Sequence, residues 1–140
     1  MEQWRPYCRK ALYYETDQMQ IIHHSNYIRW FEEARVDVMD QMGFSYGKME
    51  EMGLMLPVLN VSCKYRKPVR FGDEIAISVR LTKFSGVKLS FEYEIKNLTT
   101  GEVCTTGTSE HGIVDSNFRP FRMNKEMPDM YRRFQEYVQE

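Results

Sequence analysis

Hydrophobic positions follow two different repeats along this chain, first that of a helix and then that of strands. From residue 27 onward they return at the spacing of one helix face. Ser25 or Asn26 is expected to cap this helix, because a side-chain oxygen there can accept a hydrogen bond from a free amide of the first turn. Gly43 is expected to end it. The predicted inner face consists of Tyr27, Phe31, Ala34, Val38 and Met42, widened by Ile28, Arg35 and Met39.

After a short helical segment at residues 46–52, ended by Gly53, the repeat becomes the two-residue alternation of strands. Turn signals at 85–86 and 99–101 separate the later strands. The predicted strands are 57–65, 73–83, 87–97 and 102–115. Each of the first three should have an apolar face, and these faces hold Val61, Cys63 and Tyr65; Ile75, Ile77, Val79 and Leu81; and Leu89, Phe91, Tyr93 and Ile95.

Two more elements are predicted at the ends of the chain. A first strand at 4–14 has Pro6 near its beginning, where a missing N–H does least harm. A last helix at 127–138 has Pro128 in its first turn, where proline is tolerated. The order of strand, long helix and antiparallel strands predicts an α+β fold with one helix packed on one antiparallel sheet. The 140 residues are expected to form a single domain, 1–140.

Charge and apolar content argue against two classes of partner. The formal net charge is -1, so no strong positive field favours nucleic acid or an anionic membrane. The sequence has no signal-peptide pattern and no apolar run long enough for membrane insertion, so a cytoplasmic protein is expected. Cys8, Cys63 and Cys104 follow no metal-ligand spacing, and we expect them to be reduced and buried.

A polar loop between the first strand and the long helix carries the candidate chemistry. It holds Glu15, Thr16, Asp17, His23 and His24. A carboxylate beside a carbonyl can attack it directly or deprotonate the water that attacks it. The N-terminus of the following helix can stabilise negative charge on the carbonyl oxygen. A loop aspartate also commonly forms a turn with its own backbone, and from residue types alone this is the simpler interpretation of Asp17.

Several blocks of the sequence resemble a known family. They are Tyr13-x-x-x-Asp17, His24-x-x-Tyr27, Phe31-Glu32-x-Ala34-Arg35, Lys67-Pro68-Val69-Arg70-Phe71-Gly72-Asp73-Glu74 and, more weakly, Arg119-Pro120. These blocks resemble hotdog-fold acyl-CoA thioesterases, in particular the group containing 4-hydroxybenzoyl-CoA thioesterase and the bacterial thioesterase associated with the Tol-Pal system. The resemblance implies a hotdog fold, in which an antiparallel sheet wraps a long central helix. It also implies hydrolysis of an acyl-CoA to a free acid and CoA.

The resemblance implies roles for individual residues. Asp17 matches the family's catalytic acidic position and would be the general base or the nucleophile. His24, with the backbone amides of residues 25–27, would bind the thioester carbonyl, and Tyr13 would position the carboxylate or the carbonyl. A half-buried structural histidine and an ordinary strand tyrosine remain the alternatives for His24 and Tyr13. His23 is interpreted as a packing substitution.

Four cations, Lys64, Arg66, Lys67 and Arg70, are candidates for binding the phosphates of coenzyme A, and a solvated loop explains them equally well. No metal or bound redox cofactor is implied, and the CoA thioester is expected as the substrate. Since one helix and one sheet leave a sheet edge uncovered, a homodimer or homotetramer is expected. The resemblance implies that the sites lie between subunits. The alternative function is a non-catalytic acyl-CoA-binding module.

Two loop residues depart from the family pattern. Glu15 stands where relatives usually carry Asp. Gln20 stands where they often carry glycine, which permits a positive-φ turn that glutamine resists. The loop is therefore expected to be shaped differently from that of relatives. In the helix, Glu32 and Arg35 are three residues apart and could pair on one face. Some hotdog thioesterases use a helix glutamate in place of the loop aspartate; because Asp17 is present here, Glu32 is interpreted as structural.

Overall fold

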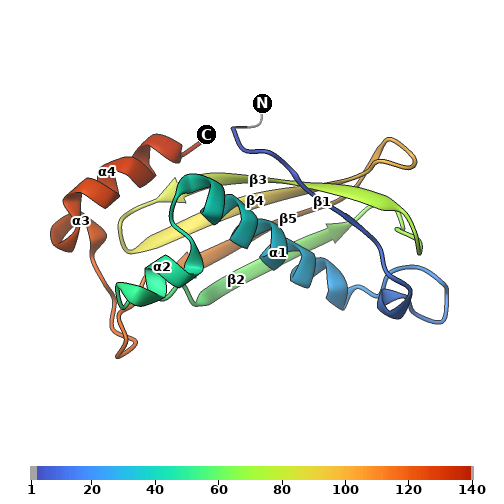
Figure 1. Cartoon of the computed structure of the whole chain (residues 1–140). Helices are drawn as coiled ribbons and strands as arrows, with labels where there is room; N and C mark the ends of the chain where they lie inside the picture. Colours follow the sequence, from blue (N-terminus) through green and yellow to red (C-terminus); the bar gives the residue numbers. More distant parts are fainter. Residues whose placement is uncertain (1–2, 140) are drawn as a thin grey trace.

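The computed structural model, which describes residues 3–139, is built on one antiparallel sheet with a long helix across one of its faces (Figure 1). The strands lie in the order β1-β3-β4-β5-β2. Their bounds are β1 (Tyr7–Lys10), β2 (Val58–Tyr65), β3 (Glu74–Phe84), β4 (Lys88–Asn97) and β5 (Glu102–Gly112). The helices are the 3₁₀ turn η1 (Tyr13–Glu15), α1 (Ser25–Met42), α2 (Tyr46–Glu51), α3 (Met123–Glu126) and α4 (Pro128–Tyr137).

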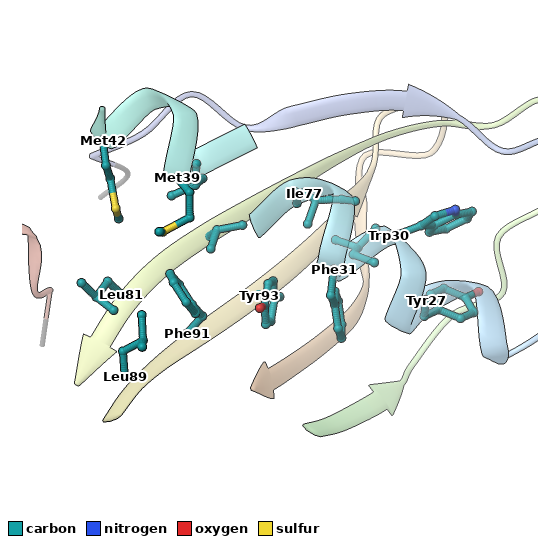
Figure 2. Packing of buried hydrophobic residues seen from close by; sticks show 14 of the residues in the cluster. Tyr27, Trp30, Phe31, Met39, Met42, Ile77, Leu81, Leu89, Phe91 and Tyr93 are labelled. Carbon is teal, nitrogen blue, oxygen red and sulfur yellow. The ribbon is translucent and has the colours of Figure 1, made fainter. Parts of the chain in front are cut away.

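The core lies between α1 and the inner face of the sheet (Figure 2). The ring of Phe31 stacks on that of Tyr93, with centroids 4.4 Å apart. Next to this pair lies Gly107 of β5. A Cβ atom there would lie 2.4 Å from the ring of Phe31, so the position has no room for a side chain. The predicted inner faces of β3 and β4 are buried, as their alternation indicated. Trp30 is also fully buried, although it lies outside the predicted helix face.

The predicted elements exist, and their ends are where the prediction was least accurate. The first strand is shorter than 4–14, because the chain leaves the sheet after Lys10 and turns into η1. The last strand ends at Gly112 rather than at 115, and α4 follows the separate turn α3. Gly43 ends α1 in the left-handed region, with φ 85°, as expected. The predicted capping of α1 is wrong, because its N-cap is His24 and no side chain caps it.

Some predicted buried positions are exposed. Ile28 is 36% exposed and does not belong to the inner face of α1. Cys8 is exposed and Cys63 is half-buried, so only Cys104 fits the expectation of burial, and all three are free thiols. The inward-facing residues of β2, a strand at the edge of the sheet, also remain open, with Val61 41% exposed and Tyr65 51% exposed, although the Tyr65 ring packs edge-on against Tyr27 of α1.

A chain of hydrogen bonds crosses the core beside this edge. Arg35 is buried and donates from Nε to the Tyr46 hydroxyl at 2.8 Å and from Nη1 to the Tyr93 hydroxyl at 3.0 Å. The Tyr93 hydroxyl lies 2.6 Å from Ser109 Oγ, which lies 2.8 Å from His111 Nε2. Arg35 therefore does not pair with the exposed Glu32 in the described part of the chain, and that prediction is wrong.

This hydrogen-bonded chain predicts a loss of stability in mild acid. Burial, and the charge of Arg35, lower the pKa of His111 to about 4. The unfolded chain, whose histidine has a pKa near 6.5, therefore binds the proton first, and stability falls as the pH drops from about 6.5 to about 4. The loss should approach roughly 3 kcal/mol. Urea unfolding across this pH range tests it, and His111→Asn should flatten the dependence, whereas an unchanged slope in the variant would rule out His111 as its source.

Among residues 3–139, no helix is both long enough and apolar enough to cross a membrane.

Candidate active site

The predicted catalytic loop is a small hairpin at the end of the molecule where α1 begins, opposite α3 and α4 (Figure 1). The His23 amide donates to the Glu15 carbonyl at 2.8 Å, and the Asp17 amide donates to the Ile21 carbonyl at 2.9 Å. The Ile22 amide also donates to the Val69 carbonyl at 2.8 Å, which ties the hairpin to the connection between β2 and β3. The loop is therefore held by backbone bonds on both sides.

Asp17 sits at the turn of this hairpin and is half-buried. Its Oδ1 accepts from the Met19 amide at 2.8 Å, and its carbonyl accepts from the Gln20 amide at 3.0 Å. The turn predicted as the simpler interpretation is therefore present. The second carboxylate oxygen, Oδ2, accepts no hydrogen bond from the described residues. One oxygen can thus hold the turn while the other remains available to a substrate or a water molecule.

Gln20 closes the turn in a conformation that favours glycine. Its φ is 67°, in the left-handed region, where a side chain costs roughly 1 kcal/mol or more. The loop therefore keeps a path that suits the glycine of relatives, rather than changing shape to avoid the strain. The expectation of a differently shaped loop is not met at this residue.

This geometry predicts that Gln20→Gly leaves the fold intact and keeps hydrolysis level or raises it, because glycine adopts this φ without strain. Gln18→Gly is a matched control, since Gln18 is an exposed neighbour outside the positive-φ residues. Steady-state kinetics test both variants. A fall of about tenfold in kcat/KM for Gln20→Gly, which is roughly 1.4 kcal/mol, would mean that the glutamine side chain itself contributes.

His24 lies at the start of α1 and is exposed. Its ring stacks on His23 with centroids 4.3 Å apart and lies edge-on to Tyr65 at 6.4 Å. The amides of the first turn, however, are not free to bind an oxyanion. The Ser25 amide donates to His23 Nδ1 at 3.2 Å, and the Asn26 amide donates to the His23 carbonyl at 3.0 Å.

The Tyr27 amide also has a partner, the His24 carbonyl at 3.3 Å. A substrate carbonyl bound by amides 25–27 would have to replace these local contacts, and that expectation stays a prediction. Within the described residues, the His24 amide makes no hydrogen bond, so His24 offers both this N–H and its ring. Burial, followed by the hydrogen bond with Cys63, raises the pKa of Tyr65 to about 12, so its hydroxyl beside His24 stays protonated at neutral pH.

Tyr13 does not lie in the strand in which the sequence places it. It lies in η1 rather than in a strand, is 74% exposed, and packs edge-on against Phe71 with ring centroids 5.6 Å apart. Among the described residues, no hydrogen bond joins the side chains of Tyr13, Asp17 and His24. The positioning role of Tyr13 therefore stays a prediction.

The four candidate phosphate-binding cations follow or end β2 and are all exposed. Lys67 pairs with Glu102 at 3.6 Å, an exposed contact that stabilises little. Arg70 is bridged to Ile21, which puts it beside the hairpin of Asp17. Lys64 and Arg66 form no ion pair within the described chain. No group of three or more potential metal ligands occurs within residues 3–139.

Sequence reasoning missed the importance of Glu15. Its carboxylate is buried and accepts hydrogen bonds from Arg9, from the Leu12 amide and from Trp30 Nε1. Only one of these contacts has a sequence signal, because a glutamate three residues after a helix cap often reaches back to the cap amide. The other two depend on the tertiary fold.

Comparisons with known proteins agree with this architecture. A family model described as the thioesterase-like superfamily matches residues 12–135. The chain therefore belongs to the thioesterase-like superfamily, and the predictions of a hotdog fold and of a thioester hydrolase are confirmed.

Individual relatives are similar over most of their length. A Bacillus subtilis protein named as a candidate acyl-CoA thioesterase, YneP, is 34% identical over 124 residues, covering 88% of this chain and 89% of the relative. The structure of a DHNA-CoA thioesterase from Staphylococcus aureus has a TM-score of 0.88 at 33% identity, covering 94% of this chain and 89% of that one. The acyl-CoA thioester hydrolase YbgC of Escherichia coli O6:H1 is 28% identical over 88 residues, covering 63% of this chain and 66% of the relative.

Proposed function

We propose that this protein hydrolyses acyl-CoA thioesters and that Asp17 carries the reaction. The observation that supports this most directly is the geometry of Asp17, whose Oδ1 is fixed by the Met19 amide while Oδ2 accepts no bond from the described residues. A fixed carboxylate with one available oxygen suits either attack on a thioester carbonyl or deprotonation of water. The names of YneP, YbgC and the staphylococcal enzyme point to CoA thioesters as the substrate class.

In the general-base route, Oδ2 of Asp17 takes a proton from water as the water oxygen bonds to the carbonyl carbon. The carbonyl oxygen becomes an oxyanion, for which the His24 amide and ring are the candidate donors in this loop. Collapse of the intermediate breaks the C–S bond, and the CoA thiolate takes the proton. In the nucleophilic route, Oδ2 itself bonds to the carbonyl carbon, and the C–S bond then breaks to give an acyl–Asp17 anhydride and the CoA thiolate, which takes a proton from water. A second water molecule hydrolyses the anhydride, which releases the free acid and restores the Asp17 carboxylate.

Coenzyme A would lie against the cations that follow β2. Lys64, Arg66, Lys67 and Arg70 are exposed, and Arg70 lies beside the Asp17 hairpin, so phosphates bound there would lead toward the loop. The CoA thioester is a substrate, and the proposed chemistry requires no metal or redox cofactor. A cytoplasmic location, where acyl-CoA is made and used, is part of this proposal.

The proposed active form is a homodimer or homotetramer. Strand β2 lies at the edge of the sheet, and its inward-facing apolar side chains are exposed, Val61 among them. An edge strand of this kind favours association with another copy of the chain.

An acyl-CoA panel with detection of the released thiol tests the proposed function. We expect CoA release that depends on enzyme concentration for at least one member of an aliphatic and aromatic series. Binding of the same thioesters without release would instead support the alternative function, a non-catalytic acyl-CoA-binding module. Neither binding nor release across the panel would contradict both.

A further inference from the structure

Glu15 connects three parts of the molecule around the Asp17 hairpin. Its side chain is 4% exposed, and its carboxylate accepts three hydrogen bonds. Arg9 Nη2 donates to Oε1 at 2.7 Å, and the Leu12 amide donates to the same oxygen at 2.8 Å. Trp30 Nε1 donates to Oε2 at 2.9 Å. The carboxylate therefore joins β1, the turn η1 and the second turn of α1.

The backbone carbonyl of Glu15 holds the other side of the hairpin. It accepts from the His23 amide at 2.8 Å and from Asn26 Nδ2 at 2.9 Å. Residue 15 thus closes the base of the hairpin that carries Asp17 and bonds this base directly to the first turn of α1, next to His24. Together with the bond from the Ile22 amide to the Val69 carbonyl, residue 15 therefore helps to fix the position of Asp17 relative to His24, through both its side chain and its backbone.

The hydrogen-bonding pattern requires a carboxylate. Three donors converge on its two oxygens, which can accept them all because an ionised carboxylate has acceptor sites only. An amide of the same size has one oxygen and a nitrogen that donates, so it would leave a donor facing a donor. Arg9 would keep its other partner, since it also bonds both carboxylate oxygens of Glu33, at 2.8 and 2.9 Å.

We propose that Glu15 is a positioning residue for the hydrolysis, which fixes the Asp17 hairpin on the N-terminal turn of α1. This inference rests on the proposed function of Asp17. A displacement of about 1 Å at a reacting group can cost a factor of about 100 in rate, so a loosened hairpin should lower turnover even in a folded protein. Glu15 touches no substrate in this scheme and acts only through the loop.

The test compares Glu15→Gln with the matched control Glu33→Gln. Both substitutions remove one carboxylate from Arg9, but Glu33 lies on α1 and does not bond the hairpin. At a temperature well below both melting midpoints, Glu15→Gln should lower kcat at least about tenfold and change KM less than about twofold. Glu33→Gln should keep kcat, and Glu15→Asp, which retains two charged oxygens, should recover part of it.

Hydrogen exchange supplies a readout that does not depend on activity. In Glu15→Gln the amides of Asp17, Gln20 and His23 should exchange faster than in the wild type, and in Glu33→Gln they should not. The positioning role would be overturned if both variants lowered kcat equally, in proportion to their loss of melting temperature. It would also be overturned if hydrogen exchange in the hairpin were unchanged in Glu15→Gln.

Two outcomes need separate treatment. If Glu15→Gln does not fold, Trp30→Phe removes a single donor to the carboxylate, and the same exchange comparison decides. If the wild type releases no CoA from any thioester, the proposed function fails. Faster hairpin exchange in Glu15→Gln would then leave Glu15 only a structural anchor of the loop, and the positioning role in hydrolysis would fall with the function.

Discussion

Asp17→Asn is expected to lower turnover at least about a hundredfold, which is the usual scale for losing a positioned acid–base group. The protein should stay folded and still bind CoA. Asparagine keeps the size of the side chain and an oxygen that can accept from the Met19 amide, so the turn should survive. It removes the charge and the basicity of Oδ2. Steady-state kinetics with thiol detection and circular dichroism measure the two effects separately.

The chain offers a matched control for this substitution at Asp115. There too Oδ1 accepts from the amide two residues on, Asn117, at 2.8 Å, and the carbonyl accepts from the Phe118 amide at 3.0 Å. Phe118 has φ 61°, close to that of Gln20. Asp115→Asn therefore perturbs the same kind of turn without touching the proposed site and should keep turnover. Near-normal turnover in a folded Asp17→Asn variant would exclude Asp17 and direct attention to Glu32.

The periodic parts of the fold could be predicted because burial there follows the sequence repeat. Ile75 to Leu81 alternate on β3, and β4 does the same, so the apolar faces could be read directly. The ends of elements depend on local geometry instead. The chain leaves β1 after Lys10 because η1 follows, and no residue between them marks this point as a proline or glycine would.

The candidate site was predictable only as far as chain order determines it. Asp17 and His24 lie on either side of one short hairpin, so their loop could be identified from the sequence. The packing of Tyr13 against Phe71 could not be predicted, because Phe71 is distant in sequence. The burial of Glu15 was missed, because charged residues are usually exposed. Arg35 was expected on the inner face of the helix, but its hydroxyl partners, like the indole and guanidinium partners of Glu15, come from other elements and could not be predicted.

The second large effect is expected at the edge of the sheet, where Val61→Asp should convert the proposed dimer into a monomer. Val61 lies on β2 opposite the buried Ser109, yet is itself 41% exposed. A second copy that covers β2 would bury this side chain. An aspartate there would place an unpaired charge in the interface, which costs several kcal/mol in a buried setting. Light scattering at micromolar concentration measures the mass of each form.

Leu98→Asp is the matched control, because Leu98 is a large apolar residue of similar exposure, 48%, that lies at the turn after β4 rather than on β2. It should leave the assembly unchanged.

If the site is formed between subunits, the monomeric Val61→Asp protein should be folded by circular dichroism and inactive toward acyl-CoA. A wild-type protein that is monomeric at micromolar concentration would refute the assembly. A monomeric Val61→Asp protein with full activity would show that each subunit contains a complete site. The exposed apolar side chains of β2 would then serve association alone.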